Sequence, residues 1–490
     1  MAMSQVNKLS DLTSLYESHF NRPPVSLEKL PGGGGDRVYY RLRGSDGATV
    51  IGVVCDTPRD ASAFVALAKV FGHEGIHVPY IICESADRIC YIQQDLGDES
   101  LFSLIQKGKR KEMGAAADGG APDRSFSLMA EEYVEKSMRE LARMQTVAAG
   151  EYEEAIEYPE FSRRQILWDL NYFKYEFLKP MALDFNESLL EDDFDAFADA
   201  LLKVDRSRWG FMYRDFQSRN VMIHDAHPYF IDFQGGMIGP SVYDAVSFLW
   251  QAKAGFSAEF RDRMLCIYAD TYAEIRSGAV TAEDMLADVP QYALFRTLQV
   301  LGAYGFRGLV EKRAHFIESI PAALENLRSL IGGGVADRYT ELKRVCESIL
   351  ADGRFEPDGH EGLLIKVFSF SYKKGYPVDL TGNGGGFMFD CRGMHNPGRY
   401  EEFKHLTGLD QPVIDFLKER GEIDPFCERA AQLVAPTVEC FLRRGFRDLQ
   451  IGFGCTGGQH RSVYSAEKVG RLLKSRFPDA HIQIIHREQS

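Results

Sequence analysis

Residues 213–220 read Tyr-Arg-Asp-Phe-Gln-Ser-Arg-Asn, and a second stretch, Ile-Asp-Phe-Gln, follows at 231–234. The first stretch places Asp215 and Asn220 on one predicted loop, and Asp232 follows a short strand-like run. In phosphoryl transfer, one carboxylate orients the acceptor hydroxyl and takes its proton, while an amide and a second carboxylate hold Mg²⁺ on the nucleotide phosphates. The two stretches supply these three groups in that chain order.

A run of glycines lies far upstream of these stretches. Glycine lets backbone N–H groups approach phosphates that side chains would block, so this run is a candidate phosphate-binding loop. The candidate nucleotide-binding residues are Gly32, Gly33, Gly34, Gly35 and Asp36. After them, residues 37–54 predict two strands joined by a Gly-Ser-Asp-Gly turn, and residues 60–75 predict a helix. Residues 1–100 are thus predicted to form a small, strand-rich lobe with one helix.

The rest of the chain divides by its pattern of apolar residues. Residues 101–350 are mostly helical in pattern, apart from 106–125, which lose all periodicity and predict a mobile insertion in a surface loop. Residues 351–360 are polar, contain Gly and Pro, and predict a linker. Residues 361–490 restart with a strand and continue as an α/β alternation.

Residues of about 25 to 350 resemble the aminoglycoside phosphotransferase family, and within it the bacterial N-acetylmuramate and N-acetylglucosamine kinases. The resemblance rests on YRDFQSRN and IDFQ, on the stretch Gly239–Ser247, and on DLGDESL, WDLNYFKYEFL and LGAYGFRGL. It implies an α+β, two-lobed, protein-kinase-like fold that uses ATP and Mg²⁺. It also implies that Asp215 is the catalytic base, that Asn220 and Asp232 are Mg²⁺ ligands, and that Asp244 braces the catalytic loop.

Two positions depart from the kinase pattern. Tyr213 stands where the catalytic loop usually has histidine, and the predicted strand at 48–57 has no lysine to pair with the α- and β-phosphates. The nearest basic residues do not single out a replacement; they are Arg37, Arg41, Arg59 and Lys69. A degenerate kinase that only binds nucleotide therefore stays open as an alternative.

A second candidate site lies near the C-terminus. Residues 449–453 predict a buried strand that runs into the loop Gly454–Ser462, which is followed by an amphipathic helix. Free N–H groups of such a loop and the guanidinium of Arg461 suit an anion. Cys455 and Arg461 also fit the C-x-x-G-x-x-R-S pattern of cysteine-dependent phosphatases, in which the cysteine is the nucleophile. Alternatively, Cys455 is a small apolar residue that ends a buried strand.

The motif CTGGQHRS, with FSFSYKKGYPVD, FMFDCRGMHNP and TGLDQPV, resembles the C-terminal domain of the RapZ family of RNase adapters. The resemblance covers 361–490 and implies an α/β module that senses a phosphosugar and contacts RNA. The implied ligand residues are Thr456, Gly457, Gly458, His460, Arg461, Asp390 and Arg392. Asn396-Pro397-Gly398 stands where the family has NPH, so one expected histidine is missing. The G-x-x-x-x-G-K-[ST] motif of the full-length adapter is absent.

Composition excludes several classes of protein. The net charge is −14, and because the charges nearly balance after residue 360, the acidic excess belongs to the first part. This disfavours a nucleic-acid groove there, since phosphate neutralisation needs clustered Lys and Arg. The start of the chain shows no secretory signal, and no apolar run is long enough to span a membrane. Nine scattered cysteines without a C-x-x-C pair favour a reducing, cytoplasmic protein.

Three functions follow from these patterns. The first is an ATP- and Mg²⁺-dependent kinase that phosphorylates a hydroxyl of an amino sugar and carries a fused phosphosugar-sensing module. The second is an RNA-binding adapter with a degenerate kinase-like domain, although the basic groups near Arg443 and Arg471 are more often a solvated face. The third is a phosphatase that uses Cys455, for which only Asp390 is available as general acid.

Overall fold

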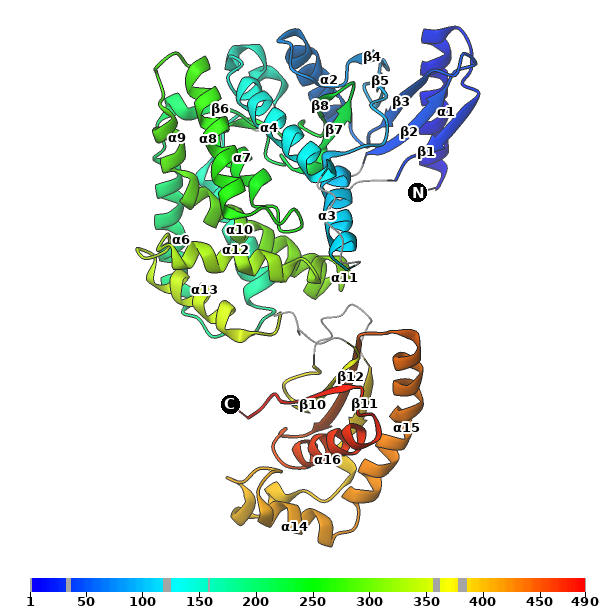
Figure 1. Cartoon of the computed structure of the whole chain (residues 1–490), viewed down its shortest axis with the longest axis vertical. Helices are drawn as coiled ribbons and strands as arrows, with labels where there is room; N and C mark the ends of the chain where they lie inside the picture. The colour runs from blue at the N-terminus through cyan, green and yellow to red at the C-terminus, as the bar shows by residue number, and fades with distance from the viewer. Residues whose placement is uncertain are drawn as a thin grey trace. The chain divides into compact units, whose positions relative to one another are not determined.

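The computed structural model describes residues 2–31, 37–117, 125–156, 159–355, 362–377 and 386–489. Contacts divide the chain into two units (Figure 1). Unit 1 comprises Met1–Gly302 and Ala322–Asp352, and unit 2 comprises Ala303–Pro321 and Gly353–Ser490. The candidate nucleotide-binding residues Gly32 to Asp36 lie outside the described residues. None of the described helices is long and apolar enough to cross a membrane.

Unit 1 begins with a five-stranded antiparallel sheet of order β1-β2-β3-β5-β4. Its strands are β1 (Ser26–Lys29), β2 (Val38–Arg43), β3 (Thr49–Val54), β4 (Ile81–Glu84) and β5 (Cys90–Gln94). The hairpin predicted over 37–54 is confirmed, since β2 pairs with β3 in register from Val38 and Val54. Helix α2 (Pro58–His73) is the predicted helix, but α1 (Ala2–Phe20) was not predicted. Its Leu12 and Tyr16 are buried in the core that includes Ile92 of β5.

The larger lobe of unit 1 is helical and holds two short antiparallel strand pairs, β6 with β9 and β7 with β8. The strands are β6 (Trp209–Met212), β7 (Val221–His224), β8 (His227–Phe230) and β9 (Met237–Pro240). The helices are α3 (Leu101–Ala117), α4 (Ser125–Gln145), α5 (Arg163–Phe173), α6 (Glu187–Leu202), α7 (Val242–Leu249), α8 (Ala258–Ile275), α9 (Ala282–Ala287), α10 (Val289–Tyr304), α12 (Ile320–Gly332) and α13 (Thr340–Asp352). The short helix α11 (Ala314–Ile317) belongs to unit 2.

The predicted loop insertion at 106–125 is wrong for residues 106–117, which continue helix α3. The segment lacks apolar periodicity, but its Gln, Lys, Arg, Glu, Met and Ala residues are strong helix formers. Intrinsic propensity therefore outweighed the missing pattern. Residues 118–124 lie outside the described residues.

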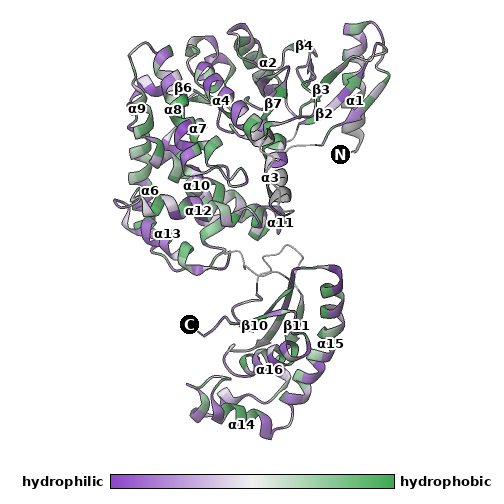
Figure 2. Cartoon of the chain, in the orientation of Figure 1, coloured by the Kyte–Doolittle hydropathy of each residue, from purple (hydrophilic) through white to green (hydrophobic). Residues whose placement is uncertain are grey.

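Unit 2 contains a four-stranded parallel sheet of order β11-β12-β10-β13. The strands are β10 (Leu364–Ser371), β11 (Phe387–Asp390), β12 (Asp448–Cys455) and β13 (His481–His486), and the helices are α14 (Gln411–Glu419), α15 (Ile423–Arg444) and α16 (Arg461–Arg476). Figure 2 shows mainly hydrophobic residues along β10 and β11 and mixed residues along α15 and α16. In the paired register Ser371 and Cys455 are partners, as are Asp390 and Gly454, so the carboxyl ends of three strands meet at one edge. Ligands of open parallel sheets bind at such an edge.

Candidate active site and C-terminal loop

The catalytic-loop residues lie between β6 and β7, and the side chain of Asp244 holds the backbone at the start of this loop. The buried carboxyl of Asp244, at the start of α7, accepts hydrogen bonds from the backbone N–H groups of Tyr213 (2.7 Å) and Arg214 (3.0 Å). The side-chain amide of Gln145 donates a third, at 2.8 Å. Burial raises the pKa of Asp244 to about 7, although the three donors act in the opposite direction. These bonds hold Arg214 at a φ of 75°, which turns the chain into the loop.

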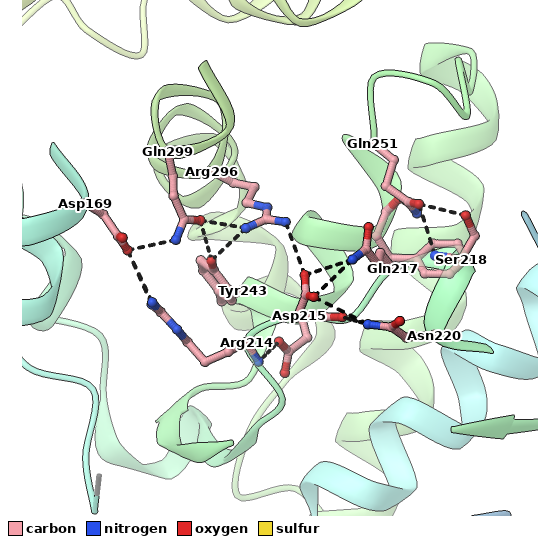
Figure 3. A network of polar contacts seen from close by, with 12 residues as sticks. Asp169, Arg214, Asp215, Gln217, Ser218, Asn220, Tyr243, Gln251, Arg296 and Gln299 are labelled. Carbon is pink, nitrogen blue, oxygen red and sulfur yellow. Dashed lines mark hydrogen bonds and ion pairs between the residues drawn. The ribbon is translucent and has the colours of Figure 1, made fainter. Parts of the chain in front are cut away.

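Asp215 projects from this loop and is half exposed (51%). Both of its carboxylate oxygens accept from the amide of Gln217, at 3.1 and 3.0 Å. The amide of Asn220 donates to the backbone oxygen of Asp215 at 2.9 Å, which leaves the amide oxygen of Asn220 available as an acceptor. Figure 3 shows the side chains of Gln217 and Asn220 converging on Asp215 from one side. The candidate base and the first metal-ligand candidate therefore form one hydrogen-bonded group.

Asp232 follows β8 and has the same local arrangement as Asp215. Each carboxylate is the first residue of an Asp-Phe-Gln sequence, and the amide of Gln234 donates to Asp232 Oδ1 at 3.0 Å. Phe216 and Phe233 are both fully buried beneath their loops. The hydroxyl of Tyr213, the residue that replaces histidine, donates to the backbone oxygen of Ile231 and so ties the two loops together.

The donor set fits a magnesium nucleotide. Asp232 and Asn220 offer a carboxylate oxygen and an amide oxygen, and Mg²⁺ binds such oxygens together with phosphates rather than in an all-protein cage. The described residues contain no group of three or more His, Cys, Asp or Glu side chains that could hold a metal ion. When bound, Mg²⁺ would neutralise the phosphate charge.

Several residues of the site were not predicted. On α10, Arg296 lies 3.9 Å from Asp215 and donates to Gln299 at 2.6 Å. Asp169 of α5 accepts from Gln299 at 2.9 Å and lies 3.4 Å from the guanidinium of Arg214 (Figure 3). No local pattern marks Asp169 or Arg296, because their partners are distant in sequence. The repeated Asp-Phe-Gln was the signal that could have identified Gln217 and Gln234.

In unit 2, Cys455 ends β12 and its thiol lies inside the loop that follows. The sulfur accepts from the backbone N–H of Gly458 at 3.2 Å and lies 3.1 Å from the hydroxyl of Ser462. Burial would raise the pKa of this thiol, but the hydrogen bonds from Ser462 and Gly458 and the charge of Arg461 lower it below its usual value. Gly458 has a φ of 73°, and a Cβ there would lie 2.3 Å from a side-chain carbon of Glu488.

The predicted ligand residues of unit 2 fall into two groups. Thr456 and Gly457 are exposed at the loop, and Asp390 is next to it, paired with Arg392 at 2.7 Å. The other three are buried and have partners within unit 2; Gly458 donates to the sulfur of Cys455. The buried guanidinium of Arg461 donates to the backbone oxygens of Arg392 (3.1 Å) and Met394 (2.7 Å), and the His460 ring lies 2.9 Å from the backbone oxygen of Phe403. These bonds join the loop to residues 392–403.

Fold and site together define a phosphotransferase of the protein-kinase-like class. The family model described as "Phosphotransferase enzyme family" matches residues 26–277, about half of the chain, and the model described as "RapZ C-terminal domain" matches 363–490. The chain belongs to the phosphotransferase enzyme family and carries a RapZ C-terminal domain.

Known proteins resemble separate parts of the chain. A nucleotide-binding protein of Dichelobacter nodosus is 39% identical over 176 residues, which cover 35% of this chain and 60% of that protein. A nucleotide-binding protein of Thermotoga neapolitana is 38% identical over 113 residues, which cover 23% of this chain and 38% of that protein. The chain thus spans less than two thirds of these curated relatives. Among solved structures, a choline kinase of Cryptosporidium parvum has a TM-score of 0.44 at 11% identity, covering 65% of this chain and 92% of its own.

Proposed function

We propose that unit 1 is an ATP- and Mg²⁺-dependent kinase that phosphorylates a hydroxyl of an N-acetylated amino sugar such as N-acetylmuramate or N-acetylglucosamine. The observation that carries the proposal is the group formed by Asp215, Gln217 and Asn220. The two amides hold the half-exposed carboxylate in place, so that it can accept a proton from an acceptor hydroxyl. Asp232 and Asn220 would hold the cation of the nucleotide.

The charges beside Asp215 support the substrate class. Arg296 lies 3.9 Å from Asp215, and the guanidinium of Arg214 is paired with Asp169 in the same network of contacts. A cationic acceptor, such as choline or an aminoglycoside with free amines, would be repelled by the arginines. Acetylation removes the charge of the amine, and a carboxylate such as that of muramate would pair with a guanidinium.

Turnover of ATP with a panel of acceptors tests this proposal. The panel contains N-acetylmuramate, N-acetylglucosamine, glucosamine and choline, and the first two should be preferred. Asp215→Asn should lower kcat by about 10²- to 10⁴-fold, because it removes the general base. Asp225→Asn is the matched control, since Asp225 is an exposed carboxylate on the β7–β8 turn. Unchanged turnover in Asp215→Asn would show that another group is the base.

We further propose that unit 2 binds a phosphosugar at the loop formed by Cys455, Thr456, Gly457 and Gly458. Support comes from the RapZ C-terminal domain match and from the position of the loop at the carboxyl edge of a parallel sheet. The backbone N–H groups at the start of α16 suit a phosphate. Glucosamine 6-phosphate should raise the unfolding temperature of unit 2 in the full chain, whereas glucosamine should not. Equal shifts with both sugars would contradict a phosphate site.

A further inference from the structure

The lysine–glutamate pair that usually contacts the nucleotide phosphates in a kinase is absent from β3 and α2. Kinases pair a lysine of the third strand with a glutamate of the neighbouring helix. Here β3 contains no lysine, and α2 contains no glutamate. Phe64 of α2 instead stacks on Phe233 at 4.7 Å between ring centres and on Tyr91 of β5 at 5.5 Å. Aromatic rings thus occupy the position next to the Asp232 loop, and the phosphates need another cation.

Four basic residues lie near the sheet, and three of them, Arg41, Arg59 and Lys69, are paired elsewhere or lie away from the catalytic carboxylates. Arg41 is paired with Asp95 at 2.7 Å and with Asp98 at 2.8 Å. Lys69 is paired with Glu84 at 2.9 Å and is more than half exposed. Arg59 and Lys69 line a cavity of about 470 Å³ together with Glu84, Arg88 and Glu154. Neither catalytic carboxylate lines that cavity.

Of these four basic residues, Arg37 is the one that reaches Asp232. It follows the glycine run after one residue, Asp36, and directly precedes β2, and its side chain is only 13% exposed. Its guanidinium donates to Asp232 Oδ1 and, at 2.8 Å, to the side-chain oxygen of Gln234. Arginine keeps its charge at any working pH and presents donors in a planar fork that suits phosphate.

We propose that Arg37 is the nucleotide-phosphate ligand of this chain, in place of the strand lysine, and that it occupies Asp232 until the nucleotide and its cation arrive. The inference rests on the proposed kinase function. Asp232 Oδ1 already accepts from the amide of Gln234 and from the guanidinium of Arg37, so a divalent cation held at this oxygen would compete with a group of the same charge. With the guanidinium moved off Asp232, Arg37 would lie beside the phosphates of the nucleotide.

Binding of three adenine ligands by the full chain separates this role from a structural one. The ligands are AMP-PNP, ADP and adenosine, measured with Mg²⁺ by calorimetry or by saturation-transfer NMR. Arg37→Gln should weaken AMP-PNP and ADP by about 10- to 100-fold, the range for loss of a charged hydrogen bond. It should leave adenosine unchanged, and Arg37→Lys should restore part of the loss. Arg41→Gln is the matched control, because Arg41 is on β2, the strand that begins directly after Arg37, and its side chain is similarly buried (15% exposed).

If Arg37 and a cation compete for Asp232, the Arg37→Gln change should have the opposite effect on the affinity for a divalent cation without nucleotide. Without nucleotide, Mn²⁺ should bind Arg37→Gln more tightly than wild type, since no guanidinium competes for Asp232. Equal AMP-PNP affinity in Arg37→Gln, equal loss for adenosine, or unchanged Mn²⁺ affinity would each overturn the inference. If the wild-type chain bound none of the nucleotides, the proposed kinase function itself would fail. If wild type and Arg37→Gln bound AMP-PNP with equal affinity, only the proposed role of Arg37 would be excluded, and the proposed kinase function would remain.

Discussion

Gly210 lies in β6, three residues before Tyr213, and its replacement by alanine would disturb the whole support of the catalytic loop. A Cβ at this position would lie 2.0 Å from the backbone oxygen of Gln145 and 3.0 Å from the hydroxyl of Ser241. Contacts of a Cβ below 3.0 Å are essentially absent from real proteins, so β6 and the end of α4 must separate by about 1 Å.

The cost follows from the bonds that Gln145 makes. Its amide donates to the backbone oxygen of Ser241 (2.9 Å) and to Asp244 (2.8 Å), and its side-chain oxygen accepts from Tyr268 at 2.7 Å. Overpacking costs about 1–3 kcal/mol, and each buried polar group that loses its partner costs about 1–3 kcal/mol more. With one such group lost, the free energy of unfolding of unit 1 should fall by about 2–6 kcal/mol.

Tryptophan fluorescence during urea unfolding measures this change selectively. All three tryptophans, at 168, 209 and 250, belong to unit 1, and Trp209 is the neighbour of Gly210. Gly150→Ala is the control, because no atom lies within 4 Å of its added Cβ. A displacement of about 1 Å should also lower turnover by about 100-fold in molecules that remain folded. A Gly210→Ala chain that unfolds within about 0.5 kcal/mol of wild type would refute the steric reasoning.

Two further predictions concern unit 2. Arg461→Ala should lower the free energy of unfolding of unit 2 by about 1.5–3 kcal/mol even without ligand, because the backbone oxygens of Arg392 and Met394 lose a charged donor. Calorimetry would show this loss as a lower unfolding temperature. An unchanged transition would show that this guanidinium is not structural. The lowered pKa of the Cys455 thiol means that its contribution to stability is present above the ordinary thiol pKa of 9.0 and is lost as pH falls through the folded value. The stability of wild type relative to Cys455→Ser should therefore rise as the pH increases toward 9 and level off above it, and a pH-independent difference would contradict this.

The local part of the site could be predicted from the sequence, and the long-range part could not. Asp215 and Asn220 are close together because one short loop carries both, and β7 and β8 return the chain so that Asp232 lies near them. Arg296 reaches Asp215 only through the packing of α10, and no nearby residue signals that contact. Helix α1 is a different case, because its Leu12 and Tyr16 are four residues apart on one helix face, a local pattern that could have predicted the helix.

The repeated Asp-Phe-Gln shows how the chain prepares both carboxylates before any ligand binds. In each copy the phenylalanine is buried beneath the loop, and the side-chain amide of the glutamine donates a hydrogen bond to the carboxylate two residues before it. The backbone is therefore fixed by apolar packing, whereas the carboxylates are held by amides and guanidinium groups that can change partners. Arg37 on Asp232 and Arg296 near Asp215 offset the two negative charges in a part of the chain that is acidic overall. Under the proposed function these arginines would lie beside the phosphates and the acceptor when a cation and an acceptor bind, so that charge neutralisation in the free site and ligand recognition would use the same residues.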